Sequence, residues 1–152
     1  MDVLVVVNPN NPDGRTHDPA ALLAAAADLA ARGGWLVVDE AFVDVAPAMS
    51  VAGAAGRPGL VVLRSFGKFH GLAGLRLGFA LAEPGLAEAI GAELGPWAVS
   101  GPAIEIGALA LDDLAWDEAM RRRLAAAARG LDGVLARHGL DPQGGADLFR
   151  LV

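Results

Sequence analysis

The chain has 152 residues, the size of one ordinary domain, and its 54% hydrophobic and 20% charged residues exclude intrinsic disorder. Its net charge of −6 argues against a broad nucleic-acid-binding surface, and we interpret the run Arg121–Arg123 as the solvated face of a helix. The absence of cysteine excludes disulfides, thiolate catalysis and cysteine-based zinc sites, and we assign no metal site.

The N-terminal segment lacks the basic stretch of a signal peptide and no apolar run reaches the length of a membrane span, so we expect a soluble cytoplasmic protein with no membrane partner. Continuous apolar runs predict buried strands, whereas caps, prolines in first turns and terminal glycines mark helices. In chain order we predict a strand at Val3–Val7, a helix from Pro19 that ends before Gly33, strands at Trp35–Val38, Leu60–Leu63 and Leu77–Leu81, helices at Pro84–Leu94, Pro102–Leu111 and Leu114–Arg137, and a strand at Leu148–Val152. This order predicts an α/β fold with a mostly parallel sheet sandwiched by helices.

The two ends of the chain are predicted to be strands. The first strand starts almost at the first residue, with no segment before it, and the sequence shows no segment that would pair with the last strand. Because a lone terminal strand is unstable by itself, we expect the chain to be a piece of a longer protein.

Polar residues follow three of the predicted strands. The segment Asn8–Gly14 comes after the first strand, Asp39 and Glu40 come after the second, and Ser65 to Lys68 come after the third. Each group alone is common in turns, helix caps or solvated loops. In open α/β sheets, ligands bind beyond the carboxyl ends of the strands. The presence of polar segments at three such ends therefore predicts a binding site.

The segment around Lys68 is otherwise small and apolar. It carries Ser65 three residues before the lysine and Arg76 eight residues after it. A hydroxyl and a guanidinium can grip one phosphate, since the planar guanidinium binds two oxygens at once. A partly desolvated lysine amine becomes a nucleophile for a carbonyl.

The string S-x-x-K with arginine eight residues on, preceded by DEAF and NPNNPDG, resembles the class I/II aminotransferases, a superfamily of fold-type-I enzymes that use pyridoxal-5′-phosphate (PLP). Within this superfamily, the motif sequences are most similar to those of cobalamin-pathway threonine-phosphate decarboxylases, which are related to histidinol-phosphate aminotransferases. The resemblance implies that Lys68 is the catalytic residue, holding PLP covalently and shuttling a proton. It also implies that Ser65 and Arg76 bind the cofactor phosphate, Asp39 the protonated ring nitrogen and Asn11 the phenolic oxygen.

Phe42 and His70 need separate interpretations. Most related aminotransferases have tyrosine where this chain has Phe42, and DEAF is typical of the decarboxylase branch, although an aminotransferase that lost the tyrosine would look the same. His70 lies two residues beyond Lys68, and we interpret it as a packing residue. We assign no role to His17 or His138, and we do not assign Arg150 to the substrate carboxylate.

The resemblance also implies the organisation of the chain. Residues 1–112 are expected to form part of the PLP-binding large domain, residues 113–139 an interdomain helix and residues 140–152 the truncated start of the small domain. The strand at Leu77–Leu81 is expected to run antiparallel, and the protein to form a homodimer. The ring-stacking aromatic, the glycine-rich phosphate loop and the substrate-carboxylate arginine of the family are not found in these residues.

These observations favour a PLP-dependent L-threonine-O-3-phosphate decarboxylase of cobalamin biosynthesis, acting on a small phosphorylated amino acid, with this chain inactive alone. One alternative is a PLP-dependent aminotransferase of the histidinol-phosphate type. Only Phe42 and the overall sequence of the motifs distinguish the decarboxylase from this alternative. The other is a truncated module without catalytic activity.

Overall fold

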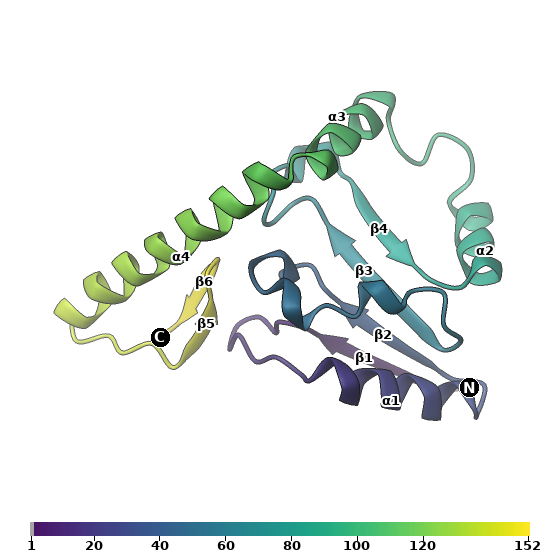
Figure 1. Ribbon diagram of the computed structural model, residues 1–152, viewed down its shortest axis with the longest axis horizontal. Coiled ribbons are helices and arrows are strands. Elements are labelled where there is room, and N and C mark those ends of the chain that lie inside the picture. Colours follow the sequence, from purple (N-terminus) through teal and green to yellow (C-terminus); the bar gives the residue numbers. More distant parts are fainter. Residues whose placement is uncertain (1) are drawn as a thin grey trace.

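The centre of the molecule is a four-stranded sheet (Figure 1). The computed structural model describes residues 2–152. The strands lie in the order β1 (Val3–Val7), β2 (Trp35–Asp39), β3 (Leu60–Ser65) and β4 (Gly78–Leu81). The first three are parallel and β4 runs antiparallel to β3. The predicted α/β fold with a mostly parallel sheet and an antiparallel fourth strand is confirmed.

Four helices and several short 3₁₀ turns connect the strands. The helices are α1 (Pro19–Ala30), α2 (Pro84–Leu94), α3 (Gly101–Asp112) and α4 (Leu114–Arg137), and the 3₁₀ turns are η1 (Val43–Val45), η2 (Pro47–Met49), η3 (Ala52–Ala54) and η4 (Ala73–Leu75). Asp18 begins α1 by accepting a hydrogen bond from the Ala20 N–H, and Asp113 begins α4 by accepting one from the Trp116 N–H. Among residues 2–152, no helix combines the length and the apolar character that a membrane crossing requires.

The core lies on one face of the sheet. Its members come from α1, from the sheet and from the turn before η3, and they are Leu22, Ala26, Leu29, Leu36, Val38, Val51, Leu60 and Val62. Side chains alternate between the faces of a strand, so the other face carries Val3, Val5 and Leu63. Val5 is 62% exposed, and Val3 and Leu63 are exposed as well. This second face is covered unevenly within residues 2–152, because Val61 on the same face is only 7% exposed.

The C-terminal strand has a partner that the sequence did not reveal. β6 (Phe149–Leu151) pairs antiparallel with β5 (Gly144–Ala146), so the expectation of an unpaired last strand was wrong. The missed strand contains two glycines, which have low strand propensity. Figure 1 shows this hairpin at the far end of α4, beside the carboxyl ends of β1 and β2. The Gly145 N–H donates to the Asp13 carbonyl at 2.9 Å, which ties the hairpin to the loop after β1.

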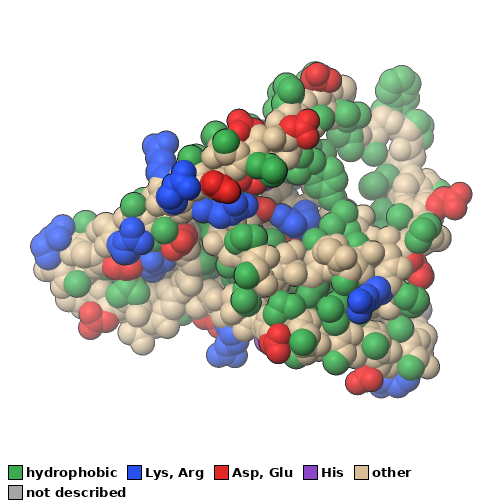
Figure 2. All heavy atoms as spheres, viewed as in Figure 1, with side chains coloured by type: hydrophobic (Ala, Val, Ile, Leu, Met, Phe, Trp, Pro, Cys, Tyr) green, Lys and Arg blue, Asp and Glu red, His purple; other side chains and the backbone are tan. Residues whose placement is uncertain are grey.

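Helix α4 joins the sheet to this hairpin, and basic side chains gather along it with acidic ones among them (Figure 2). Arg122 and Arg123 are exposed, as predicted for a solvated face. Arg121 is not, because its Nε donates to the Asp44 carbonyl at 2.7 Å. The prediction for this basic run was therefore wrong at Arg121, which turns toward the sheet. The division into residues 1–112, 113–139 and 140–152 stays a prediction.

Candidate functional site

The polar segments after the strands begin at one edge of the sheet. The Asn8 N–H donates to the Asp39 carbonyl at 2.8 Å, and the Glu40 N–H donates to the Leu63 carbonyl at 2.9 Å. The parallel ladder therefore continues one step beyond β1 and β2. This hydrogen bonding brings the NPNNPDG loop, the DEAF segment and the end of β3 to the same edge, as the sequence predicted.

Lys68 lies in a tight connection between β3 and β4. Phe66 and Phe69 flank it and are each 3% exposed, whereas Lys68 itself is exposed. The Leu72 N–H donates to the Phe66 carbonyl at 3.0 Å, which closes the loop. Two buried aromatic anchors thus hold a short loop from which the amine projects. Lys68 is the only lysine in the sequence.

Phe42 forms an apolar wall beside this amine. The Lys68 Nζ lies 5.5 Å from the centroid of the Phe42 ring, within cation–π range. On another side, the Phe42 ring packs edge-to-face against Phe149 of β6, with centroids 5.1 Å apart. Phe42 therefore contacts both the lysine and the C-terminal hairpin, two segments that are far apart in the sequence.

Asp39 and Ser65 lie on the open face of the sheet. Asp39 pairs in register with Leu63, and Ser65 follows Leu63 by two residues, so all three share the face opposite the core. One oxygen of Asp39 accepts the Ala41 N–H at 2.9 Å, and the Ser65 Oγ accepts the Gly67 N–H at 3.1 Å. These bonds orient a carboxylate and a hydroxyl on neighbouring strands.

Arg76 lies on the other side of the β3–β4 connection, two residues before Gly78, which pairs with Ser65. It adopts a left-handed conformation with φ of 53°, uncommon for a residue with a side chain. Its Nη1 donates to the Ala73 carbonyl at 3.1 Å and the side chain is exposed. The hydroxyl and the guanidinium predicted to bind phosphate thus come from the two sides of one connection.

Asn11 projects from the loop after β1. The loop is built on Asn8, which is fully buried, donates to the Met49 carbonyl at 2.9 Å and accepts the His17 N–H at 2.9 Å. Asp13 accepts the Arg15 backbone N–H and the Asn10 amide, and these bonds lower the pKa of the Asp13 carboxyl. Asn11 itself is exposed.

Of the five predicted site residues, no two are joined by a hydrogen bond or an ion pair within residues 2–152. Lys68, Arg76 and Asn11 are exposed, and Asp39 and Ser65 are half-buried. Their chemistry fits PLP: an accessible amine for an aldehyde, a carboxylate for a protonated ring nitrogen, and a hydroxyl with a guanidinium for a phosphate.

A buried ionic cluster behind the site was missed by sequence reasoning. Glu40 is fully buried; one of its oxygens accepts the Ser50 hydroxyl and the other the Val51 N–H, both at 2.6 Å. Arg64 Nη1 lies 3.8 Å from a Glu40 oxygen, and Arg64 Nη2 bonds to Asp44. A signal was present: an arginine that continues the apolar run of β3 needs a counter-charge, and the DEAF segment supplies acids four residues apart.

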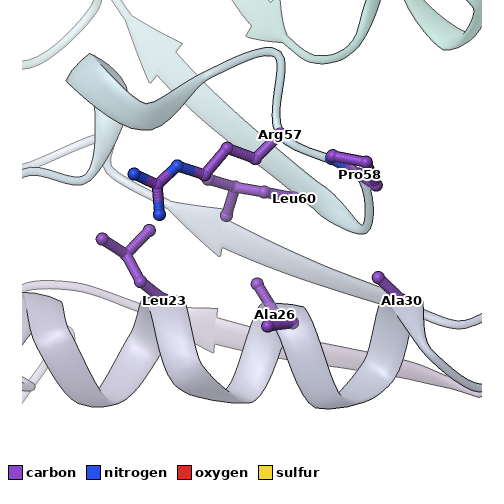
Figure 3. Close-up of a pocket in the computed structure, with 7 residues that line it drawn as sticks. Leu23, Ala26, Ala30, Arg57, Pro58 and Leu60 are labelled. Carbon is purple, nitrogen blue, oxygen red and sulfur yellow. The ribbon is translucent and has the colours of Figure 1, made fainter.

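Two cavities lie beside the sheet, and one of them adjoins the candidate site. One of about 360 Å³ has Ser65, His70 and Arg64 in its wall and lies between the sheet and the start of α4. The other, of about 300 Å³, lies between α1 and the start of β3 (Figure 3). Its wall is apolar except for Arg57, whose guanidinium extends along the pocket toward Leu23. This second pocket is at the amino ends of the strands, away from the candidate site.

Comparison with known proteins agrees with this geometry. The sequence profile of the aminotransferase class I and II family matches residues 1–149. The chain is 56% identical to threonine-phosphate decarboxylase from Pseudomonas aeruginosa, covering 100% of this chain and 46% of that protein. It is 51% identical to threonine-phosphate decarboxylase from Sinorhizobium sp, covering 99% of this chain and 45% of that protein. The chain thus spans about half the length of these curated relatives.

Two solved structures of PLP-family enzymes share the fold of this chain. Histidinol-phosphate aminotransferase from Sinorhizobium meliloti, in complex with PLP, superimposes with a TM-score of 0.84 at 27% identity, over 94% of this chain and 39% of that one. L-threonine-O-3-phosphate decarboxylase from Porphyromonas gingivalis superimposes with a TM-score of 0.76 at 27% identity, over 95% of this chain and 47% of that one. The relatives are PLP-dependent enzymes, and PLP is the cofactor of the family. The chain belongs to the aminotransferase class I and II family.

Proposed function

We propose that the chain supplies the lysine-bearing half of a cytoplasmic, PLP-dependent L-threonine-O-3-phosphate decarboxylase of cobalamin biosynthesis. The observation that carries the proposal is the 56% and 51% identity to two threonine-phosphate decarboxylases over essentially the whole chain. Phe42 supports it, because its ring offers the Lys68 amine an apolar wall without a hydroxyl.

Each predicted site residue has a role in this proposal. PLP, when bound, accepts the electron pair that the departing carboxylate leaves on the substrate carbon. Lys68 holds the cofactor through its amine and later carries a proton at Nζ to that carbon. Asp39 pairs with the protonated ring nitrogen and so keeps the ring electron-poor, while Asn11 donates to the phenolic oxygen. Ser65 and Arg76 bind the phosphate from the two sides of the β3–β4 connection.

A chimaera tests the proposal directly. The segment of the Pseudomonas aeruginosa relative that matches this chain is replaced by these 152 residues, and release of carbon dioxide from L-threonine phosphate is measured. We expect decarboxylation by the chimaera and none by the same chimaera with Lys68→Ala. A folded chimaera that binds PLP but releases no carbon dioxide would contradict the proposed reaction.

An aminotransferase of the histidinol-phosphate type is the second candidate, supported by the TM-score of 0.84 to a histidinol-phosphate aminotransferase. The same chimaera separates the two functions. Amino transfer from histidinol phosphate to 2-oxoglutarate, without release of carbon dioxide from threonine phosphate, would favour this candidate.

The chain alone is expected to bind PLP weakly and to turn over no threonine phosphate. Its candidate site is open to solvent, since Lys68, Arg76 and Asn11 are exposed. The chain also spans only 46% of the Pseudomonas aeruginosa relative. Loss of one electrostatic contributor in a preorganised site costs about a hundredfold or more in rate. Robust decarboxylation by the purified 152-residue chain would contradict this expectation.

We also propose a homodimer. Large apolar side chains are exposed around α3, where Trp97 is 96% exposed and Ile104 and Leu109 are more than half exposed. Exposed apolar patches of this kind are normally covered by a partner. Light scattering over a range of concentrations tests this, and a monomer at the highest concentration would count against it.

A further inference from the structure

The ends of β2 and β3 and the loop that carries Lys68 each have a charged or titratable side chain within two residues of a predicted site residue. Arg64 precedes Ser65 and lies on the core face of β3, and the buried Glu40 follows Asp39. His70 follows Lys68 by two residues and has a side chain that is only 7% exposed. These neighbours do not belong to the predicted PLP contacts, yet the structure links them to one another.

The link runs through helix α4. The Asp44 carboxylate bonds to Arg64, and the Asp44 carbonyl accepts the Arg121 Nε–H at 2.7 Å. Arg121 Nη2 lies 3.3 Å from one oxygen of Asp117. The other Asp117 oxygen lies 3.6 Å from His70 Nε2. Polar contacts thus lead from Arg64 at the strand end to Asp117 of α4, and a separation of 3.6 Å remains between Asp117 and His70 of the loop that carries Lys68.

Aromatic packing holds the same loop against the same helix. His70 stacks on Phe66 at 4.3 Å and on Trp116 of α4 at 5.7 Å, with ring planes within 11°. The Arg121 guanidinium lies 5.4 Å from the centroid of Phe69. Phe69 and His70, the two residues that follow Lys68, therefore contact the first two turns of α4. His70 packs as the sequence predicted, and it also faces an acid that the sequence did not reveal.

The polar contacts are incomplete within residues 2–152. Arg64 Nε, His70 Nδ1 and Asp117 Oδ1 are buried without a hydrogen-bond partner, and all three residues line the cavity of about 360 Å³. A buried polar atom without a partner costs about 1–3 kcal/mol. The 3.6 Å between His70 and Asp117 exceeds hydrogen-bond distance by only a few tenths of an ångström, on the usual limit of about 3.2 Å. A small displacement of α4 toward the loop would bring this pair within bonding distance.

The far end of α4 reaches the lysine by a second route. Asp132 of α4 binds Arg150 of β6, with Nε to Oδ1 at 2.5 Å and Nη2 to Oδ2 at 3.0 Å. Phe149, the neighbour of Arg150, contacts Phe42, whose ring lies beside the Lys68 amine. Both ends of α4 are therefore connected to the surroundings of Lys68.

We propose that Asp117 and Arg121 are positioning residues, which make the placement of the Lys68 loop depend on the placement of helix α4. The proposal rests on the proposed function, in which Lys68 is the residue that holds PLP. Neither Asp117 nor Arg121 touches the cofactor contacts; they act through His70, Phe69 and Asp44.

Helix α4 offers a matched control for the experiment. Asp117 and Arg121 form an i,i+4 pair that faces the site, and Glu118 and Arg122 form the next i,i+4 pair, which faces solvent. The Asp117 side chain is 19% exposed and the Glu118 side chain is 71% exposed. Asp117→Asn and Glu118→Gln therefore remove one negative charge each from adjacent positions of one helix, and Arg121→Gln with Arg122→Gln repeats the comparison for the positive charges.

The first measurement needs no cofactor. Deuterium exchange is followed in a peptide spanning Phe66–Leu72, whose Gly71 and Leu72 amides donate to the carbonyls of Lys68 and Phe66. We expect exchange about tenfold faster in Asp117→Asn and Arg121→Gln, a change of about 1.4 kcal/mol in loop opening. In Glu118→Gln and Arg122→Gln we expect less than about a twofold change, as for exposed pairs.

The second measurement is the visible circular dichroism per bound PLP, which reports the asymmetry around Lys68 and is insensitive to a helix that is merely less stable. We expect the circular dichroism per bound PLP to fall by about half in Asp117→Asn and to stay unchanged in Glu118→Gln. Equal exchange rates and equal circular dichroism in the two variants would overturn the proposal. If the chimaera described above forms no Lys68 adduct with PLP, the proposed function fails, while the exchange experiment on this chain still decides the coupling of α4 to the loop.

Discussion

The two faces of the sheet carry different kinds of polar residues. On the open face, Asp39 and Ser65 each accept one local N–H, in surroundings where Val5 and Leu63 are exposed. On the core face, Glu40 and Arg64 are held in a buried cluster with several partners. Asp39 and Glu40 are adjacent in the sequence, and so are Arg64 and Ser65.

Adjacent residues at one strand end can therefore have two different roles. Because side chains alternate along a strand, one residue can face a ligand while its neighbour anchors the backbone from behind. A site needs groups whose orientation is fixed by their surroundings. We therefore expect changes on the open face to affect PLP binding, and changes on the core face to affect stability.

The largest effect is expected at Lys68, at the edge of the open face. Incubation with PLP, reduction with borohydride and peptide mapping by mass spectrometry should locate one pyridoxyl group on Lys68, the only lysine in the chain. Lys68→Ala should abolish this adduct, and so should Lys68→Arg, which keeps the positive charge but lacks a primary amine. An adduct of unchanged yield that maps elsewhere in the Lys68→Ala variant would contradict the assignment.

Substitutions of Asp39 and Glu40 test the difference between the two faces of the sheet. Glu40→Ala removes the buried partner of Arg64, Ser50 and Val51, and we expect a loss of about 3 kcal/mol in the free energy of unfolding. Asp39→Ala removes one hydrogen bond to the Ala41 N–H, and we expect a loss of about 1 kcal/mol.

Urea denaturation measures both free energies, and the yield of reduced Lys68 adduct measures PLP binding. Asp39→Ala should lower that yield at PLP concentrations where the unmodified chain is half-saturated. Glu118→Ala, an exposed acid on α4, is the control and should change stability by about 0.5 kcal/mol or less. Equal destabilisation by Asp39→Ala and Glu40→Ala would remove the distinction between the faces.

Phe42 should show an intermediate effect, because it joins the open face to the hairpin. Its edge-to-face contact with Phe149 is expected to contribute about 1 kcal/mol. A double-mutant cycle with Phe42→Leu and Phe149→Leu measures this coupling by urea denaturation. Additive losses, with no coupling between the two changes, would show that the rings do not stabilise each other.

The smallest effect is expected from acid at the hairpin. Arg150 donates to Asp132 and lowers the pKa of its carboxyl, so the pair contributes fully above the ordinary aspartate pKa of about 3.9. As pH falls through the lowered pKa, Asp132 becomes protonated and the contribution is lost. Deuterium exchange of residues 144–151, expressed relative to the intrinsic exchange rate at each pH, should therefore accelerate below about pH 4, and Asp132→Asn should remove that acceleration. The same acceleration in Asp132→Asn would assign it to another group.

Sequence motifs named the residues of the candidate site but not the buried side chains that lie behind it. Lys68, Asp39 and Ser65 lie in short motifs at strand ends, and motifs of this kind are local in sequence. The cluster of Glu40, Asp44 and Arg64 was not predicted, since a charged residue at a strand end is usually solvated. Only the packing of η1 and η3 over the sheet buries these side chains and makes them partners.

Local sequence signals were sufficient to place most of the helices and strands, with β5 as the exception. The predicted bounds of β1, α2 and α4 agree with the structure, because continuous β-branched runs, first-turn prolines and terminal glycines act within a few residues. The sequence did not show that Arg121 turns inward, that His70 faces Asp117 or that Gly144–Ala146 pairs with the last strand. The contacts of Arg121 and His70 join residues dozens of positions apart, which only the folded chain brings together, whereas the hairpin pairs residues three to seven positions apart and was missed because glycine has a low strand propensity.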